Sequence, residues 1–163
     1  MIAILNFLHK TNELVFNKLG LEIKSISLEK ESADYNPCQL LLNEKKALFR
    51  TAKITPTKTG QFVTLWKRIP KGPIAPFAIE DNFDLVIINT ETENHFGQFV
   101  FPKSILIEKG IFSTALKEGK RAIRVYPPWD KTTSKQAQQT QQWQLKYFMV
   151  IPFEKDVASQ LYF

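Results

Sequence analysis

The sequence is poor in the residues that form covalent cross-links and metal centres. Its 163 residues include one cysteine, Cys38, and two histidines, His9 and His95. A single cysteine cannot form an internal disulfide, and neither histidine has cysteines or carboxylates at the spacing of a metal site. We therefore expect no bound metal. Cys38 directly precedes an apolar run and is interpreted as a buried, inert thiol.

Long hydrophobic runs and glycine-rich loops are also missing. No run approaches the roughly 18 apolar residues that a transmembrane helix needs, so we expect no contact with a membrane. The first residues, MIAILNFLHK, have neither a basic start nor a small-residue cleavage site, which predicts no signal peptide and a cytoplasmic location. The surroundings of Gly60 and Gly72 lack the strand–loop–helix pattern of a phosphate-binding loop. Ser104 and Ser134 have no base beside them that would make a nucleophile.

Length and composition fit one soluble domain. The chain has a mass of 18.9 kDa, with 44% hydrophobic and 23% charged residues. A chain of this length can bury a core without disulfides or metals. The sequence therefore predicts a single domain over residues 1–163.

Acidic residues are absent where basic residues are densest. Residues 45–79 contain eight Lys or Arg and no Asp or Glu, whereas residues 80–93 contain five acids and no base. Residues 94–163 contain ten bases and five acids, and the whole chain has a net charge of +6. A basic belt interrupted by one acidic segment favours a surface that meets an anionic partner. The alternative is that these charges form an ordinary solvated face.

The stretch 45–68, KKALFRTAKITPTKTGQFVTLWKR, predicts two β-strands joined by a turn. Its first half alternates between two faces, and residues 57–60 have the composition of a turn. The return strand is predicted over 62–68. We expect Lys53 and Lys67 to face the same way on neighbouring strands.

The rest of the chain mixes helix and strand signals. Apolar residues over 4–19 recur with helical spacing. Thr133 and Gln136 have the spacing of a capping box, which predicts a helix from about 134 to about 150. The segment 104–110 fits a short helix or a strand. The remaining apolar runs predict strands at 39–42, 83–89, 98–102 and 122–126.

The last predicted helix carries a glutamine-rich patch, QAQQTQQWQ. One side of the helix contains Gln141 and Gln144, and another contains Gln136, Gln139 and Trp143. A glutamine amide both donates and accepts hydrogen bonds, so such a face on a basic protein could contact nucleic-acid bases or phosphates. The interpretation that we favour for most of these glutamines is that they only face solvent, while the aromatic residues of the helix pack in the core.

Four blocks of the sequence resemble the MepB protein family. They are AKITPTKTGQFVTLWKR (52–68), GPIAPF (72–77), FGQFVFPKSIL (96–106) and GKRAIRVYPPWDKTTSKQAQQTQQWQ (119–144). The resemblance covers residues 31–148. It implies an α/β (α+β) fold similar to the restriction-endonuclease-like architecture, with a mixed central sheet flanked by helices, in a bacterial protein. The family name comes from a gene cluster with a multidrug efflux pump, which is a genomic association and implies no activity.

A nuclease of that fold needs carboxylates for a divalent cation and a lysine for the developing charge. Such folds usually supply an Asp on one strand and a Glu-x-Lys on the next, and Asp84 matches the first. The next predicted strand has Gln98 in place of an acid, and Lys103 lies beyond it. Glu31 and Asp130 have no spacing that requires them to approach Asp84. We therefore expect no catalytic residue and no cofactor. The alternative is a phosphodiesterase that uses Asp84 with Mg²⁺ or Mn²⁺.

The favoured hypothesis is a basic module that binds DNA or RNA on a catalytically degenerate fold. Its cleft candidates are Trp66, Asp84 and Gln98, and Trp66 or Trp129 could stack on a base. A module that binds an acidic protein or a small anion is the remaining alternative. The cations expected to contact nucleic acid or another anion are Lys53, Lys58, Lys67, Arg68, Lys71, Lys103, Lys120, Arg121, Arg124 and Lys131.

Overall fold

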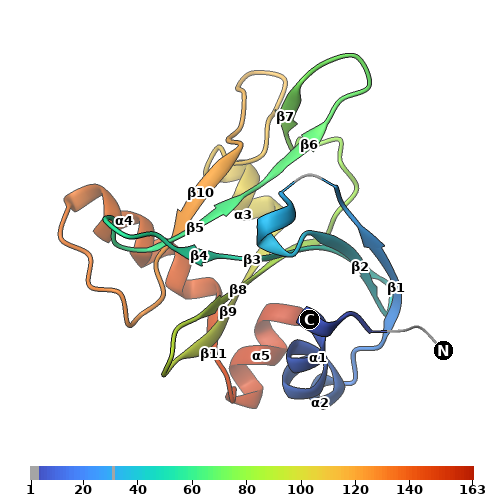
Figure 1. Ribbon diagram of the computed structural model, residues 1–163, viewed down its shortest axis with the longest axis vertical. Coiled ribbons are helices and arrows are strands. Elements are labelled where there is room, and N and C mark those ends of the chain that lie inside the picture. The colour runs from blue at the N-terminus through green and yellow to red at the C-terminus, as the bar shows by residue number, and fades with distance from the viewer. Residues whose placement is uncertain (1–3, 31) are drawn as a thin grey trace.

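A six-stranded mixed sheet forms the centre of the protein (Figure 1), whose computed structural model describes residues 4–30 and 32–163. Across the sheet the strands are β1 (Ile23–Leu28), β2 (Cys38–Leu42), β3 (Lys45–Thr51), β8 (Leu85–Glu91), β9 (Phe96–Pro102) and β11 (Phe148–Val150). β3 and β8 run parallel, and the other neighbouring pairs are antiparallel. The α/β class with a mixed central sheet is confirmed, whereas its likeness to restriction endonucleases stays a prediction.

Helices cover one face of this sheet (Figure 1). They are α1 (Asn6–Thr11), η1 (Asn12–Phe16), α2 (Asn17–Leu19) and α5 (Lys155–Tyr162). The first three are continuous, which confirms the helix predicted near the start, and Gly20 ends it with φ of 71°. Phe49 and Ile87 of the sheet pack here against Leu8 and Phe16 of the helices. None of the described helices is long and apolar enough to cross a membrane.

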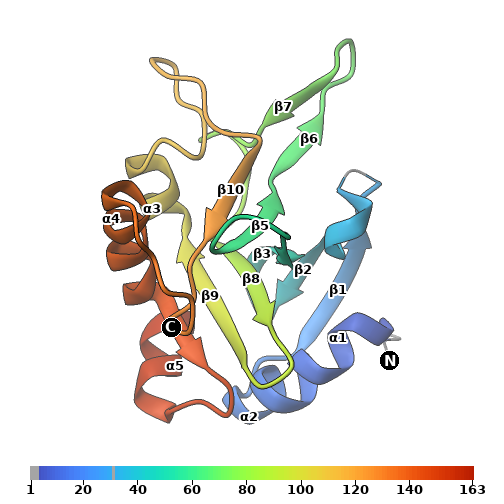
Figure 2. The same cartoon turned by 60° about the vertical axis from the view of Figure 1, so that its left-hand side comes forward.

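A small second sheet and two helices cover the opposite face (Figure 2). The sheet has the order β10 (Ala122–Val125), β5 (Gln61–Thr64), β4 (Lys53–Ile54), and the helices are α3 (Lys103–Glu108) and α4 (Lys135–Gln144). Leu48, Val86 and Phe101 of the central sheet pack against Val63 and Val125 of the small sheet. Strands β3 and β8 bury side chains on both faces, so each contains a continuous apolar run, over 47–49 and 85–88, in place of an alternating pattern.

An arm formed by β6 (Trp66–Arg68) and β7 (Ile74–Pro76) projects at one end of the molecule (Figures 1 and 2). The short helix η2 (Ala33–Tyr35) lies between β1 and β2 in the chain. With the arm, the predicted hairpin over 45–68 is divided among three sheets.

That division corrects one prediction. Lys53 pairs with Phe62, whereas Lys67 pairs with Ala75, so the two lysines do not lie on neighbouring strands. The reason is that β3 hydrogen-bonds to β2 on one side and to β8 on the other. It therefore has no free edge for a return strand, and only the short β4 pairs with β5.

The predicted helix over 134–150 is also too long. α4 ends at Gln144, the 3₁₀ turn η3 (Leu145–Tyr147) follows, and Phe148 begins the edge strand β11. The helix cap is Ser134, whose hydroxyl accepts a hydrogen bond from the backbone N–H of Ala137 at 3.1 Å. The predicted capping box of Thr133 and Gln136 is wrong, and the segment 104–110 is confirmed as largely helical.

Candidate functional site

The three cleft candidates lie in separate places. Asp84 immediately precedes β8, and its carboxylate accepts a hydrogen bond from the backbone N–H of Lys46 at 2.8 Å. Gln98 is fully buried opposite Asn89 and accepts a hydrogen bond from the Tyr162 hydroxyl in the helical layer. Asn89 lies five positions after Asp84 along the chain, which is about 17 Å at the usual rise of a strand. Trp66 lies half-buried in β6.

The carboxylates considered for a nuclease are not gathered either. Within residues 4–30 and 32–163, no group of three or more His, Cys, Asp or Glu could hold a metal ion. Glu31 lies outside the described residues. Burial raises the pKa of the Asp130 carboxyl, and the charge of His95 partly lowers it. The phosphodiesterase that uses Asp84 stays a prediction.

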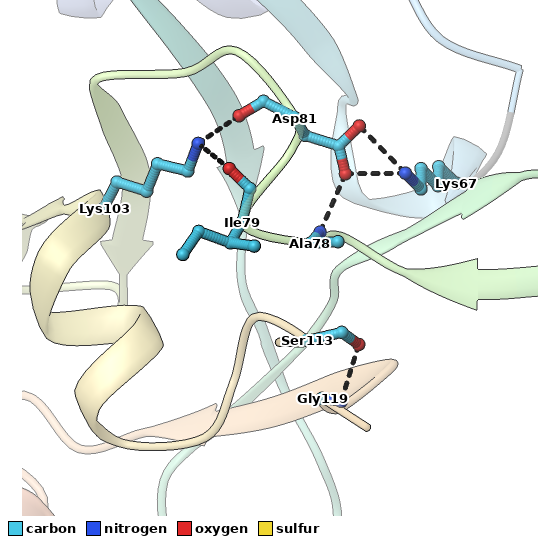
Figure 3. A network of polar contacts seen from close by, with 7 residues as sticks. All are labelled: Lys67, Ala78, Ile79, Asp81, Lys103, Ser113 and Gly119. Carbon is cyan, nitrogen blue, oxygen red and sulfur yellow. Dashed lines mark hydrogen bonds and ion pairs between the residues drawn. The ribbon is translucent and has the colours of Figure 1, made fainter. Parts of the chain in front are cut away.

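Lys67 and Lys103 do come together, at the loop before β8 (Figure 3). The Lys67 ammonium contacts both carboxylate oxygens of Asp81, at 2.8 and 2.6 Å, and one of these oxygens also accepts from the Ala78 N–H at 2.7 Å. Lys103 donates to the backbone oxygens of Ile79 and Asp81. We call this segment, residues 78–84, the Asp81 loop. Both lysines hold it in place through contacts inside the protein.

Arg50 is a further cation of the basic belt, and it bonds inside the protein. Its side chain is fully buried, and its guanidinium meets both carboxylate oxygens of Glu29 at 3.0 and 2.9 Å. It also donates to the backbone oxygens of Thr64 and Phe49. This pair joins β3 to β5 and to the segment after β1.

The other predicted contact residues are scattered. Trp129 stacks on the His95 ring with centroids 4.7 Å apart. The Lys53 ammonium lies 5.6 Å from the Tyr35 ring centroid, and Arg121 pairs with Glu118 at 2.9 Å. Exposed positions on turns, loops and the arm are occupied by Lys58, Arg68, Lys71 and Lys131.

A groove between β10 and α4 has a different character. It is a hollow of about 380 Å³, and Asp and Glu are absent from its described lining. We call it the α4 groove. Three cations and three aromatic residues line it: Lys109, Lys120, Arg124, Phe62, Tyr126 and Trp143.

Strand alternation turns the side chain of Arg124 outward from β10. Ile123 and Val125 point into the core, so Arg124 points to the groove. Arg124 pairs with Phe62 of β5, and its guanidinium lies 5.6 Å from that ring. Gly60, with φ of 88°, allows the Tyr126 ring to pack directly on the turn, because a Cβ there would lie 2.6 Å from Tyr126 Cε1.

Two glutamines fix the other wall. The buried Gln144 amide accepts from the Tyr126 N–H and donates to the Arg124 carbonyl oxygen, both at 2.9 Å. The Gln141 amide donates to three backbone oxygens after β10, including that of Asp130 at 3.0 Å. These two side chains attach α4 to β10 and do not face solvent, whereas the other four glutamines of the patch are exposed, as expected for most of them.

The groove continues along the exposed side of α4. A neighbouring hollow of about 490 Å³ shares Lys109 and Trp143 with it and adds Lys146. The Lys109 ammonium lies 5.6 Å from the Trp143 ring centroid. Lys109 and Lys146 were not predicted as contact residues. The spacing of Gln136, Thr140 and Trp143 with Lys146 is the signal that could have indicated this face.

A larger hollow, of about 600 Å³, lies between the N-terminal helices and β1. Its described lining contains one cation, Lys24, and one acid, Glu22, which pair at 3.1 Å. Its charges cancel, so the α4 groove is the more favourable site for an anion.

Comparisons with known proteins agree with the resemblance seen in the sequence. A family model described as MepB-like matches residues 29–150. A solved structure described as "Crystal Structure of MepB" superimposes with a TM-score of 0.78 and 38% sequence identity. The match covers 87% of this chain and 97% of that chain. No curated protein matches the sequence.

Proposed function

The chain belongs to the MepB-like family, and for this member we propose that it binds nucleic acid through the α4 groove. The supporting observation is that Lys109, Lys120 and Arg124 share a hollow with three aromatic rings and, within its described lining, with no carboxylate. Cations attract the phosphate backbone whatever its sequence, and aromatic faces stack on bases.

A polymer suits the groove better than a small anion does. The cations are spread over two adjoining hollows, from Lys120 before β10 to Lys146 in η3, which follows α4. A chain of phosphates can contact several of them at once, whereas one small anion cannot. The net charge of +6 adds a long-range attraction for any polyanion.

The proposed activity is binding without cleavage. The described lining of the groove supplies cations, amides and hydroxyl groups, and none of these is a carboxylate that would hold a divalent cation for hydrolysis. The groove residues would position the phosphates and bases and leave them intact.

The test is the affinity of labelled oligonucleotides, measured by fluorescence anisotropy at several salt concentrations. We expect the logarithm of the binding constant to fall linearly with the logarithm of salt concentration. The double variant Lys120→Ala/Arg124→Ala should weaken binding to all sequences alike and reduce the slope by roughly two, one for each phosphate contact.

A matched control removes the same charge elsewhere. Lys53→Ala/Lys71→Ala also deletes two exposed cations, which lie outside the groove, and should change affinity and slope far less. Equal losses in both double variants, or an affinity that ignores salt, would contradict the proposal. A thermal-shift series of inorganic phosphate, mononucleotides and oligonucleotides completes the test, because only nucleic-acid binding predicts stabilisation that rises with length.

A further inference from the structure

We infer that β1 pairs with β1 of a second copy of this chain, so that two molecules share one continuous antiparallel sheet. Such a dimer would form whether or not the α4 groove binds nucleic acid, because β1 contributes no residue to the described lining of that groove. Three features of β1 support the dimer: an unblocked edge, the order of its side chains, and a hollow beside it.

Among the described residues, β1 is the longest strand that has an unpaired edge. It has six residues and lies at the margin of the central sheet (Figures 1 and 2). The opposite margin, β11, has only three residues, and the edge of β10 is covered by the amide of Gln144. Proteins usually block an exposed edge with charges, prolines or bulges. β1 has a charge and a shift in register at Lys24, but residues 25–28 have neither a charge nor a proline.

The backbone of β1 bonds to β2 through alternate residues. The Glu29 N–H donates to the Pro37 oxygen at 3.1 Å, so Ser27 takes the next bonded position along the antiparallel pair. The N–H and C=O groups of Ile26 and Leu28 therefore point away from the sheet. They are available to a further antiparallel strand.

Two copies of β1 fit together when Ile26 pairs with Ile26 of the second copy. The twofold axis then places Ser25 opposite Ser27 of the second copy, and hydroxyl pairs of this kind stabilise neighbouring strands. Glu22, whose side chain is 71% exposed, comes opposite the exposed Lys30 of the second copy. Because the interface is symmetric, this ion pair forms at both ends of it.

The neighbouring registers fit less well. If Ile26 paired with Leu28 of the second copy, Lys24 would lie opposite Lys30, and like charges directly opposite are destabilising. If Ile26 paired with Lys24 instead, the Glu22 carboxylate would lie opposite the apolar Leu28. Glu22 already pairs with Lys24 of its own chain at 3.1 Å, and its two oxygens allow it to accept from a second lysine as well.

Leu28 and the hollow beside β1 supply the apolar contact. The Leu28 side chain is 62% exposed, and it points to the helical face of the sheet because its partner Cys38 packs in the core there. The hollow of about 600 Å³ between β1 and the N-terminal helices lies on the same face, at residues 20–24. Its apolar lining is Ile4, Leu21 and Ile23. In the antiparallel pair, Leu28 of each copy comes beside the hollow of the other, which is the self-complementarity that a twofold interface needs.

Cross-linking tests the register. Ser25→Cys and Ser27→Cys proteins, mixed under mild oxidation, should form a disulfide-linked heterodimer much faster than either variant links to itself. The two Cα atoms of such a pair lie about 4.5 Å apart, which is within the range for a disulfide. Cys38 should not interfere, because it is buried and burial raises the pKa of its thiol to about 12. Equal rates in the mixture and in the separate variants would overturn the register.

Sedimentation equilibrium tests the dimer itself, up to about 1 mM, where a complex worth only ~4 kcal/mol is half formed. The average mass of the wild type should rise with concentration. Leu28→Lys should raise the dissociation constant at least about tenfold, because two leucines lose an apolar contact. Val150→Lys makes the same change at an exposed position of β11 and should leave the constant unchanged. A monomer at every concentration, or equal effects of the two variants, would overturn the inference.

Charge exchange provides a test that does not depend on loss of folding. Glu22→Lys should weaken the dimer, and Glu22→Lys/Lys30→Glu should restore it, because the ion pair is formed again with its signs reversed. A double variant no better than the single one would overturn the pairing of these two residues. Oligonucleotide affinity, measured on Leu28→Lys, should equal that of the wild type, so a failure of the dimer leaves the proposed function intact.

Discussion

The Asp81 loop and the α4 groove place basic side chains in opposite electrostatic surroundings. At the loop, Lys67 is paired with the Asp81 carboxylate, and Lys103 is bonded to backbone oxygens (Figure 3). In the groove, Lys120 and Arg124 line a hollow whose described lining contains no acid. One set of cations stabilises the fold, and the other lines the hollow where the proposed nucleic-acid ligand would bind.

This difference shows that the net charge of a sequence segment does not indicate whether its charged side chains bond within the protein or face solvent. The acidic residues over 80–93 interrupt the basic belt in the sequence, but in the fold one of them, Asp81, neutralises Lys67 of the belt. Asp84 accepts the backbone N–H of Lys46, and Glu91 pairs with Lys10, which lies outside the belt. A ligand can use only the cations that remain.

The largest effect is expected where a cation is fully internal. Glu29→Ala would leave the buried Arg50 guanidinium without its carboxylate. We expect a loss of about 3–5 kcal/mol in the free energy of unfolding, the usual result of removing one partner from a buried ion pair. Urea unfolding with an unchanged m-value measures it.

Removing both charges provides the control. Glu29→Ala/Arg50→Met should be less destabilised than the sum of the two single variants, because no buried charge is left unpaired. If Glu29→Ala lowers the free energy of unfolding by less than about 1 kcal/mol, the Glu29–Arg50 pair behaves like an exposed ion pair. Arg50 would then not belong to the internal cations.

The attachment of α4 to β10 should show the next largest effect. Gln144→Leu removes bonds to the Tyr126 N–H and the Arg124 carbonyl oxygen. We expect a loss of about 2–4 kcal/mol, since each unsatisfied buried group costs about 1–3 kcal/mol. Thermal or urea unfolding measures it. Gln142→Leu, on the exposed side of the same helix, should change stability by less than about 0.5 kcal/mol.

A pair of lysine variants tests the comparison directly. Lys67→Met should cost about 1 kcal/mol of stability, because its ion pair with Asp81 is partly shielded from water, and it should leave oligonucleotide affinity nearly unchanged. Lys120→Met should weaken oligonucleotide binding and leave stability nearly unchanged. Unfolding and anisotropy on both variants give the result, and a similar loss of affinity in the two would contradict the distinction between the two regions.

Much of the fold could be predicted from local patterns. The strands near 39–42, 83–89, 98–102 and 122–126 and the N-terminal helix are confirmed within a few residues, because alternation and helical spacing are properties of adjacent residues. The buried position of Cys38 is confirmed as well, and burial raises the pKa of its thiol to about 12. The division of the stretch 45–68 among three sheets could not be predicted, since it depends on β8, whose residues pair with those of β3 from 38 positions further along the chain.

The candidate site was predicted only in part. Lys120 and Arg124 were expected to contact an anion, but Lys109 and Trp143 reach the same hollow from α3 and α4. Sequence distance hides such convergence. The function of Gln144 was missed for a related reason. Its amide bonds to the backbone of β10 in the place where a neighbouring strand would bond, and no pattern in the adjacent residues indicates such a contact.

The smallest effect on stability is expected at Asp130, whose surroundings differ from those of Asp81. Burial removes solvent from the Asp130 carboxylate, and the charge of His95 offsets only part of that loss. Burial raises its pKa above the ordinary value of 3.8. The folded state therefore binds the proton more tightly than the unfolded chain does. The stability that this group contributes is present below pH 3.8 and is lost as the pH rises through the folded-state pKa.

Asp130→Asn removes this loss. At pH 7 the variant should unfold at a slightly higher temperature than the wild type, and the difference should vanish near pH 3, where the wild-type carboxyl is protonated in both states. Thermal unfolding across this pH range measures it, with Glu93→Gln, an exposed carboxylate in the turn before β9, as the control. A variant less stable than the wild type at pH 7 would mean that Asp130 is held by a favourable charge as Asp81 is, and the contrast between the two acids would not hold.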